Sequence, residues 1–146
     1  MTASQTHSHT TKIQVRFKDI DQQGHVNNAN HLTYAETSRV NYFQQILGKD
    51  VDWDETGLLL ARTEIDYLEP IFFEDEIEVT CAVSAIGNKS FDMENVILKI
   101  TAEEKKVCAK VKSVFVCFNY NTKSSTMVPE IWKHKFIEFE KNIDIK

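Results

Sequence analysis

The sequence predicts an α+β domain with five strands, one long helix and a short C-terminal helix. A short alternating segment near the N-terminus is followed by a long segment with helical periodicity. Four further segments then alternate between apolar and polar residues, as half-buried strands do, and turn residues separate them. Pro129 opens a second, short amphipathic helix. The predicted order of elements is therefore β, α, β, β, β, β, α.

The bulk properties limit the classes of protein to consider. The 146 residues suit one domain, and we expect residues 1–11 to be a disordered tail and residues 12–146 a single domain. A formal net charge of −5 argues against broad nucleic-acid binding. We expect no membrane span and no signal peptide, because neither kind of apolar run occurs. Cys81, Cys108 and Cys117 lack C-x-x-C spacing, which favours free buried thiols and a cytoplasmic location.

Each predicted element has a local cause. The segment 12–18 alternates as a half-buried strand. The long helix should begin near Asn27 or Asn28, because asparagine is a good N-cap, and Gly48 should end it. The later strands are expected at residues 57–67, 76–85, 91–100 and 107–120, with Gly87-Asn88 as a hairpin turn. A shift in the alternation predicts a β-bulge near Glu94 or Asn95.

Glu36 falls within the predicted buried face of the long helix. The apolar stripe on that face is expected to comprise Ala29, Leu32, Val40, Phe43 and Leu47. A carboxylate on a buried face has to be paired, neutral or functional. Arg39 lies one helical turn further on and can reach Glu36. We interpret the two as a structural ion pair, with a catalytic role for Glu36 as the alternative.

A polar turn at residues 19–27 joins the first strand to the helix. A helix start offers unpaired backbone N–H groups and a partial positive charge, and a carboxylate upstream can lie beside whatever those groups bind. The pattern D-x-D-x-x-G-H-V-N-N resembles the signature of the hot-dog-fold acyl-CoA thioesterases, and more narrowly of their 4-hydroxybenzoyl-CoA thioesterase-like branch. Its residues in this sequence are Asp19, Asp21, Gly24, His25, Val26, Asn27 and Asn28.

This resemblance implies the hot-dog fold, in which an antiparallel five-stranded sheet wraps around one long helix. It also implies the hydrolysis of acyl-CoA thioesters to free acid and CoA. It implies that Asp21 is the catalytic general base or nucleophile, and that the backbone N–H of Asn28 binds the oxyanion. Asn27 would cap the helix or position water, and His25 would brace the turn. Tyr34, Glu36 and Arg39 also match the Y-x-E-x-x-R of that branch. The expected cofactor and the expected metal are both none.

The acyl-CoA substrate needs further contacts. Lys89 and Ser90 resemble a basic-then-serine pair of relatives that binds coenzyme A, and Arg62 is another candidate for the phosphates. His31 stands where relatives often carry an aromatic residue and could touch the acyl group, as could Glu36. Asp19, Asp21, His25 and His31 have metal-ligand chemistry, but no standard ligand spacing fits them.

The sequence is also compatible with other functions, and it predicts an oligomer. The turn could be an elaborate N-cap without chemistry. The domain could bind or sense acyl thioesters without turnover, hydrolyse acyl-carrier-protein thioesters, or act as another hot-dog enzyme such as an enoyl-thioester hydratase. No G-x-S-x-G, P-loop or H-E-x-x-H motif occurs. One helix cannot cover both faces and the edges of the sheet, so we expect a homodimer or homotetramer.

Overall fold

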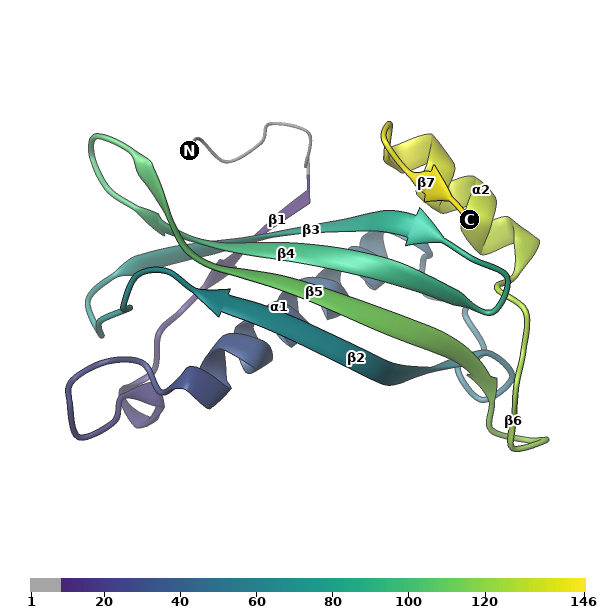
Figure 1. The fold of residues 1–146 in the computed structure, drawn as a ribbon, viewed down its shortest axis with the longest axis horizontal. Helices are drawn as coiled ribbons and strands as arrows, with labels where there is room; N and C mark the ends of the chain where they lie inside the picture. Colours follow the sequence, from purple (N-terminus) through teal and green to yellow (C-terminus); the bar gives the residue numbers. More distant parts are fainter. Residues whose placement is uncertain (1–8) are drawn as a thin grey trace.

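The computed structural model describes residues 9–146. Its strands are β1 (His9–Ile13), β2 (Gly57–Tyr67), β3 (Glu76–Ile86), β4 (Ser90–Ile100), β5 (Lys105–Asn119), β6 (Ser124–Ser125) and β7 (Asp144–Ile145), and its helices are α1 (Asn28–Ile46) and α2 (Glu130–Phe139). The main sheet has the order β1-β3-β4-β5-β2 and is antiparallel throughout, which confirms the predicted five-stranded sheet (Figure 1). The two-residue strands β6 and β7 pair with β5 and β3.

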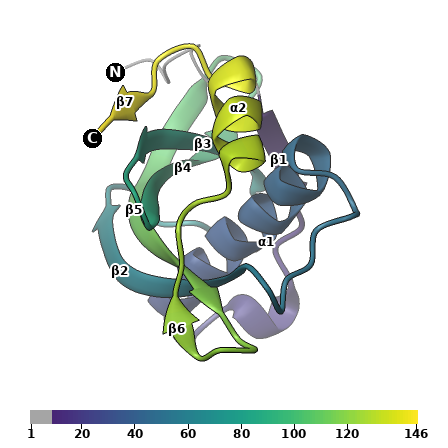
Figure 2. The ribbon, with the colours of Figure 1, turned by 90° about the vertical axis from the view of Figure 1, so that its right-hand side faces the viewer.

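The long helix α1 lies on the concave side of the curved sheet (Figure 2). It contacts β1, β3, β4 and β5, while α2 packs near its C-terminal end. The predicted caps of α1 are confirmed. Asn27 is the N-cap and its side chain accepts a hydrogen bond from the backbone N–H of Ala29 at 3.0 Å. Gly48 follows the helix with a φ of +86°, a conformation that favours glycine.

The predicted N-terminal boundary is wrong. The strand expected at residues 12–18 is β1, which begins at His9 and ends at Ile13 in register with Cys81 to Ile77. Residues 9–11 therefore belong to the sheet, and the rest of the predicted tail, residues 1–8, lies outside the described residues. After β1 the chain leaves the sheet and forms a 3₁₀ turn at Phe17–Asp19, which the alternating pattern did not distinguish from a strand.

The predicted buried face of α1 is wrong at Ala29, Leu32 and Val40, whereas Phe43 and Leu47 are buried as expected. Leu32 and Val40 are 39% and 49% exposed, and Glu36 lies exposed between them. The residues of α1 that are buried against the sheet are His31, Tyr34, Ala35, Ser38, Arg39, Tyr42 and Phe43. No ion pair between Glu36 and Arg39 occurs in the described chain; the guanidinium of Arg39 instead lies 5.1 Å from the centre of the Phe115 ring. Glu36 is therefore not a buried structural partner.

A layer of buried polar side chains explains why the hydrophobic pattern predicted the wrong face of α1. The core has two apolar clusters, one around Tyr42, Phe91 and Phe136 and the other around Ile77, Val79 and Ile97. Between them, polar side chains from helix and sheet are buried: Ser38, Arg39, Asn95 and Ser113. Asn95 occupies an inward position on β4, so the expected bulge at residues 94–95 is wrong. The register shift in the β4–β5 pairing lies between Ile97 and Leu98.

The remaining surfaces of the sheet differ in character. On the outer face, Glu64, Lys112 and Glu94 are neighbours on β2, β5 and β4, which makes this face charged rather than apolar. The edge strand β2 is long, and Leu60 on it is 53% exposed. Exposed apolar side chains lie at the β2 edge and along the outward side of α1, and also on α2 and in the loops around the turn before α1: Leu59, Leu60, Leu32, Val40, Ile131, Ile137, Phe17, Phe72 and Phe73.

Glu140 connects the C-terminal segment to the core through hydrogen bonds. Its buried Oε2 accepts hydrogen bonds from the Tyr42 hydroxyl at 2.6 Å and from the backbone N–H of Val83 at 3.0 Å. We predict that Glu140→Gln lowers the free energy of unfolding by about 1–3 kcal/mol, because an amide oxygen is a weaker acceptor for the two buried donors than a carboxylate oxygen. The exposed Glu36→Gln is the matched control and should change it by less than about 0.5 kcal/mol. Equal effects in chemical denaturation would contradict this account.

Candidate active site

The polar turn before α1 folds back onto the helix that follows it. The backbone N–H of Asn27 donates to the carbonyl of Asp19 at 2.8 Å, and the Asn30 side-chain amide donates to the same oxygen at 3.1 Å. Val26 donates its N–H to the carbonyl of Ile71 at 2.7 Å. The beginning and the end of the turn are therefore joined, and the turn is docked on the loop that follows β2.

The carboxylate of Asp19 is buried inside this turn. It accepts hydrogen bonds from the backbone N–H of Arg16 at 3.0 Å, from the Arg16 guanidinium at 3.2 Å and from the Tyr34 hydroxyl at 2.8 Å. Burial acts to raise the pKa of Asp19, but these donors outweigh it and hold the pKa below its ordinary value. All three contacts hold the turn to the preceding segment and to α1.

Asp21 occupies a different environment two residues further on. One of its carboxylate oxygens, Oδ1, accepts hydrogen bonds from the backbone N–H groups of Gln23 at 2.9 Å and His25 at 3.4 Å. The backbone N–H of Asp21 donates to the His25 carbonyl at 2.9 Å, and Gly24 closes the turn with a φ of +85°. Asp21 is partly exposed, and its Oδ2 has no hydrogen-bond partner within residues 9–146. One oxygen is thus held in place and the other is available.

The start of α1 faces a small pocket next to this turn. The pocket has a volume of about 230 Å³ and is lined by His25, Val26, Asn28, His31, Tyr67, Leu68, Glu69 and Pro70. The backbone N–H of Asn28 donates to no group in the described chain, whereas Ala29 and Asn30 donate to Asn27. An unpaired N–H at a helix start can bind an oxygen that gains negative charge. Asp21 itself is not among the residues that line this pocket.

Two histidines of the predicted site also lie at this pocket. The His25 ring packs edge-on against Phe72, with ring centres 5.1 Å apart, so it braces the turn on the following loop. The His31 ring packs edge-on against Tyr67, with ring centres 5.0 Å apart, and the Tyr67 hydroxyl donates to the carbonyl of Asn28 at 3.0 Å. Tyr67 had not been predicted as a site residue, because nothing in the sequence of β2 indicates that its end returns to the helix start.

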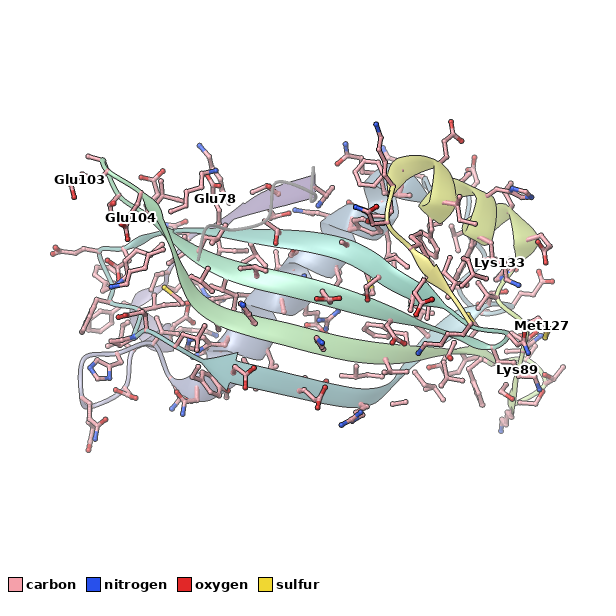
Figure 3. The ribbon with its side chains drawn as sticks, turned by 45° about the horizontal axis from the view of Figure 1, so that its top comes forward. Glu78, Lys89, Glu103, Glu104, Met127 and Lys133 are labelled. Atoms are coloured by element: carbon pink, nitrogen blue, oxygen red, sulfur yellow. The ribbon has the colours of Figure 1, made fainter. Side chains whose placement is uncertain are left out.

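Three of the predicted substrate-binding residues lie away from this pocket in the same chain. Lys89 and Ser90 belong to the β3–β4 hairpin, at the end of the sheet opposite the turn, and Figure 3 shows Lys89 at the far end from Glu103 and Glu104. Arg62 lies on the outer face of the sheet, where it pairs with Glu64 at 2.9 Å. A single chain therefore does not bring these residues together with Asp21 and Asn28.

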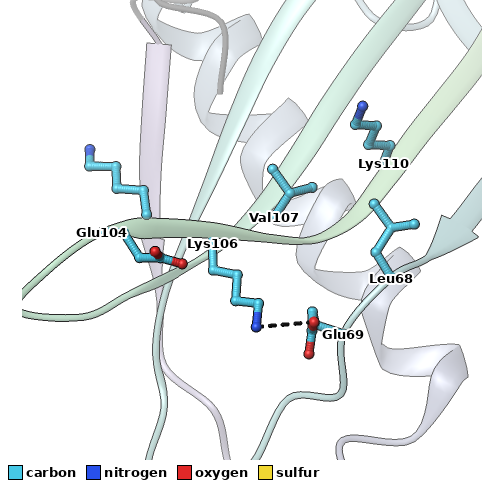
Figure 4. Close-up of a pocket in the computed structure, with 7 residues that line it drawn as sticks. Leu68, Glu69, Glu104, Lys106, Val107 and Lys110 are labelled. Carbon is cyan, nitrogen blue, oxygen red and sulfur yellow. Dashed lines mark ion pairs between the residues drawn. The ribbon is translucent and has the colours of Figure 1, made fainter. Parts of the chain in front are cut away.

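A second pocket adjoins the first at Leu68 and Glu69. Its volume is about 490 Å³, and its remaining lining comes from the β4–β5 hairpin and the start of β5: Glu104, Lys105, Lys106, Val107 and Lys110. Figure 4 shows Lys106 paired with Glu69, at 3.1 Å. Lys105 pairs with Glu78 at 3.2 Å. Cations are thus present near the helix start, although two of them are already neutralised by carboxylates.

The structure also bears on cysteine and metal chemistry. The three cysteines are free and buried, as predicted, and burial raises the pKa of Cys81 to about 12 and that of Cys117 to about 11. These thiols stay protonated at neutral pH and are unsuited to nucleophilic attack. Among residues 9–146, no three His, Cys, Asp or Glu side chains are grouped so as to hold a metal ion. No helix in that range is long and apolar enough to cross a membrane.

Known proteins resemble this chain in overall sequence and in fold. Residues 15–136 match the model of the Thioesterase-like superfamily. A thioesterase from Thermus thermophilus, solved with coenzyme A and Zn, is 33% identical with a TM-score of 0.81, over 94% of this chain and 97% of that one. The Bacillus subtilis protein YsmA is 30% identical over 82 residues, so the match spans 56% of this chain and 55% of YsmA.

Two relatives have names that state a substrate class. The long-chain acyl-CoA thioesterase FadM of Escherichia coli is 27% identical over 79% of this chain and 86% of FadM. The acyl-acyl carrier protein thioesterase ATL3 of Arabidopsis thaliana is 26% identical over 93% of this chain and 71% of ATL3. Because the family match runs from the turn through most of α2 and the fold agrees along nearly the whole chain, the protein belongs to the Thioesterase-like superfamily and has its hot-dog fold.

Proposed function

We propose that the protein hydrolyses acyl-CoA thioesters to the free acid and CoA. The observation that carries this proposal is the unpaired backbone N–H of Asn28 at a pocket beside the turn that holds Asp21. Thioester hydrolysis needs a donor for the oxyanion and a carboxylate to activate water or to attack. It hardly needs a general acid, because a thiol with a pKa of roughly 8.5 is a tolerable leaving group.

In this mechanism the thioester carbonyl oxygen accepts the hydrogen bond of the Asn28 N–H. A water oxygen bonds to the carbonyl carbon while Asp21 takes its proton, and the carbonyl oxygen gains the negative charge. The oxyanion then collapses, the carbon–sulfur bond breaks and the CoA thiolate leaves. Alternatively, an Asp21 carboxylate oxygen bonds to the carbonyl carbon and the CoA thiolate leaves, which gives a mixed anhydride. Water then opens the anhydride at the Asp21 carbonyl carbon and releases the acid. In both routes Asn27 caps the helix and keeps the Asn28 N–H pointing at the pocket.

Coenzyme A is the favoured carrier because the solved thioesterase at 33% identity holds coenzyme A, and FadM is an acyl-CoA thioesterase. The alternative carrier is an acyl-carrier protein, as the name of ATL3 states. A higher kcat/KM for the acyl-carrier-protein form of one acyl group than for its CoA form would favour that alternative. Steady-state release of free thiol excludes a binding or sensor domain, and analysis of the products excludes a hydratase. The buried free thiols suit a reducing compartment such as the cytoplasm.

We also propose that the active unit is a homodimer, or a homotetramer built from it. The β2 strand has an unpaired edge and carries exposed Leu60, which a second copy would cover. An antiparallel β2–β2 pair places the Tyr67 end of one strand beside the Gly57 end of the other. The β3–β4 hairpin lies at the Gly57 end, because Gly57 and Ser90 pair with neighbouring positions of β5. Lys89 and Ser90 of the partner subunit would then approach the pocket.

Loss of the carboxylate at position 21 tests the catalytic assignment. Asp21→Asn keeps the size and most hydrogen bonds of the side chain but removes the base or nucleophile. We expect kcat in a thiol-release assay to fall at least about a hundredfold, with little change in substrate affinity. Near-normal turnover would refute the assignment. A single turnover of the wild-type enzyme in oxygen-18 water separates the two routes, since direct attack labels the product acid and the anhydride route labels Asp21.

Asp19→Asn is the matched control for that variant. The asparagine side chain has the same size and keeps one acceptor oxygen for the hydrogen bonds that hold the turn, so kcat of the folded protein should fall far less than in Asp21→Asn. The melting temperature at pH 7 should fall. The pKa of Asp19 is lowered in the folded state, so its carboxylate stabilises the fold above the unfolded-state value of roughly 3.9. That contribution disappears as the pH falls through the folded-state pKa, and the difference from wild type should therefore narrow toward pH 3. A constant difference across this range would contradict the hydrogen-bonding account.

A negative charge introduced at the β2 edge tests whether the protein dimerises through this strand. We expect Leu60→Asp to shift the protein toward monomer in light scattering and to lose turnover, because a buried carboxylate would lack a partner in the interface. Ile131→Asp, at an exposed position on α2, is the matched control and should leave the mass unchanged. A wild-type protein that is an active monomer at micromolar concentration would rule out a shared site.

Removal of the positive charge of Lys89 tests whether this residue binds a CoA phosphate. If Lys89 of the partner subunit binds a CoA phosphate, Lys89→Gln should raise KM for acyl-CoA several-fold and leave kcat close to wild type. The exposed Lys123→Gln should change neither value. An unchanged KM for Lys89→Gln would contradict this role and would favour Lys106, at the pocket beside the helix start, as the residue that binds the phosphate.

A further inference from the structure

We propose that Tyr67 is a positioning residue of the thioesterase site, whose hydroxyl holds the backbone around Asn28 so that the Asn28 N–H stays directed at the oxyanion. This inference rests on the proposed thioesterase function and adds a residue that lies outside the sequence motif of the turn. Tyr67 acts through Asn28 and exchanges no proton with the substrate, so it is not a catalytic residue.

The first argument is that hydrogen bonds hold both peptide groups that flank Asn28. In the group before it, the carbonyl of Asn27 accepts the backbone N–H of Asn30 at 2.9 Å. In the group after it, the backbone N–H of Ala29 donates to the Asn27 side chain at 3.0 Å. The carbonyl of that second group, which belongs to Asn28, accepts the Tyr67 hydroxyl at 3.0 Å.

The two peptide groups are planar and share the Cα of Asn28. A displacement of the second group therefore changes the direction of the first group, which carries the Asn28 N–H. Of the three hydrogen bonds, only that of Tyr67 connects the helix start to another element, because the other two lie within residues 27–30. Tyr67 is thus the contact that relates the oxyanion donor to the sheet.

The second argument is that Tyr67 itself is held firmly. It is the last residue of β2 and is still paired with β5. The backbone N–H groups of the next two residues, Leu68 and Glu69, both donate to the carbonyl of Cys108, at 2.8 and 3.1 Å. The Tyr67 ring packs edge-on against His31, with ring centres 5.0 Å apart. A hydroxyl carried by such an element can keep the helix start in one position.

The third argument is that Tyr67 lies at the reaction pocket and not in the core. Tyr67 and Asn28 line the same pocket, and Tyr67 is 44% exposed. The hydrogen bond of an exposed hydroxyl contributes little to the free energy of unfolding. A displaced oxyanion donor, by contrast, destabilises the transition state, in which the carbonyl oxygen carries negative charge. The neutral carbonyl of the bound thioester depends less on that donor, so loss of the hydroxyl should lower kcat and leave KM nearly unchanged.

Tyr67→Phe tests this role, because it removes the hydroxyl and keeps the ring. We expect kcat for hexanoyl-CoA, or for palmitoyl-CoA if that is the faster substrate, to fall about fivefold, since a loosened donor should cost less than the roughly hundredfold of a lost one. KM should change by less than about twofold and the melting temperature by less than about 2 °C. Tyr42→Phe is the matched control. Its hydroxyl donates to Glu140 near the other end of α1, so that variant should lower the melting temperature and keep kcat.

Binding of two carbonyl analogues separates positioning from a structural role. A ketone with a methylene between the carbonyl and the sulfur of the same acyl-CoA mimics the bound substrate. Its α,α-difluoro ketone is hydrated in water and mimics the tetrahedral intermediate. Tyr67→Phe should weaken binding of the difluoro ketone by about the same factor as kcat/KM, and binding of the plain ketone by less than about twofold.

Two further replacements of Tyr67 test whether donation matters, and they also serve if Tyr67→Phe does not fold. O-methyltyrosine keeps the oxygen but cannot donate, so it should lower kcat as Tyr67→Phe does. Para-aminophenylalanine keeps an N–H donor at the same place and should restore most of kcat.

Wild-type kcat in the variants that cannot donate, or a raised KM with kcat unchanged, would overturn the inference while the thioesterase function stands. Equal weakening of the two ketones would overturn it too, because the hydroxyl would then serve binding alone. Absence of thiol release from every acyl-CoA on wild-type protein would refute the thioesterase function itself.

Discussion

The buried carboxylate of Asp19 is the interaction on which the site depends. Its oxygens bind the backbone and guanidinium of Arg16 and the hydroxyl of Tyr34, while its carbonyl binds Asn27. These contacts join the exit of β1, the turn and the first turns of α1 into one unit. The available oxygen of Asp21 and the unpaired N–H at the helix start are both held by that unit. A separate aspartate thus fixes the geometry in which Asp21 is proposed to react.

The parts of the fold that local chemistry determines were predictable from the sequence. Asn27 caps α1 and Gly48 ends it, as their side-chain and backbone preferences indicate. The bounds of β2 agree with the prediction because Gly57 and Pro70 interrupt the pattern on either side. The orientation of α1 was not predictable. Its buried face includes Ser38 and Arg39, which a hydrophobic stripe omits, because the sheet offers them a polar layer and the ring of Phe115.

For the candidate site too, the sequence predicted what local chemistry determines and missed what depends on tertiary packing. The motif placed the turn, the helix start and His31 at one pocket, since residues close in sequence at a helix start stay close in space. Tyr67 reaches the same pocket from β2, a contact that depends on tertiary packing and leaves no local signal. Whether Lys89 lies near the helix start was not predictable, because a hairpin pattern does not tell which end of the sheet faces the helix start. In the observed sheet, the β3–β4 hairpin lies at the end away from the helix start. Lys89 therefore reaches this pocket only if a second copy of the chain supplies it.

The most direct measurement of the central claim is a crystal structure of the Asp21→Asn variant with an acyl-CoA trapped in it. The account predicts the thioester carbonyl oxygen within hydrogen-bonding distance of the Asn28 N–H, with the side chain at position 21 facing the carbonyl carbon. A thioester bound elsewhere, for example at the outer face near Arg62, would contradict the account. So would a carbonyl at this pocket with position 21 turned away from it.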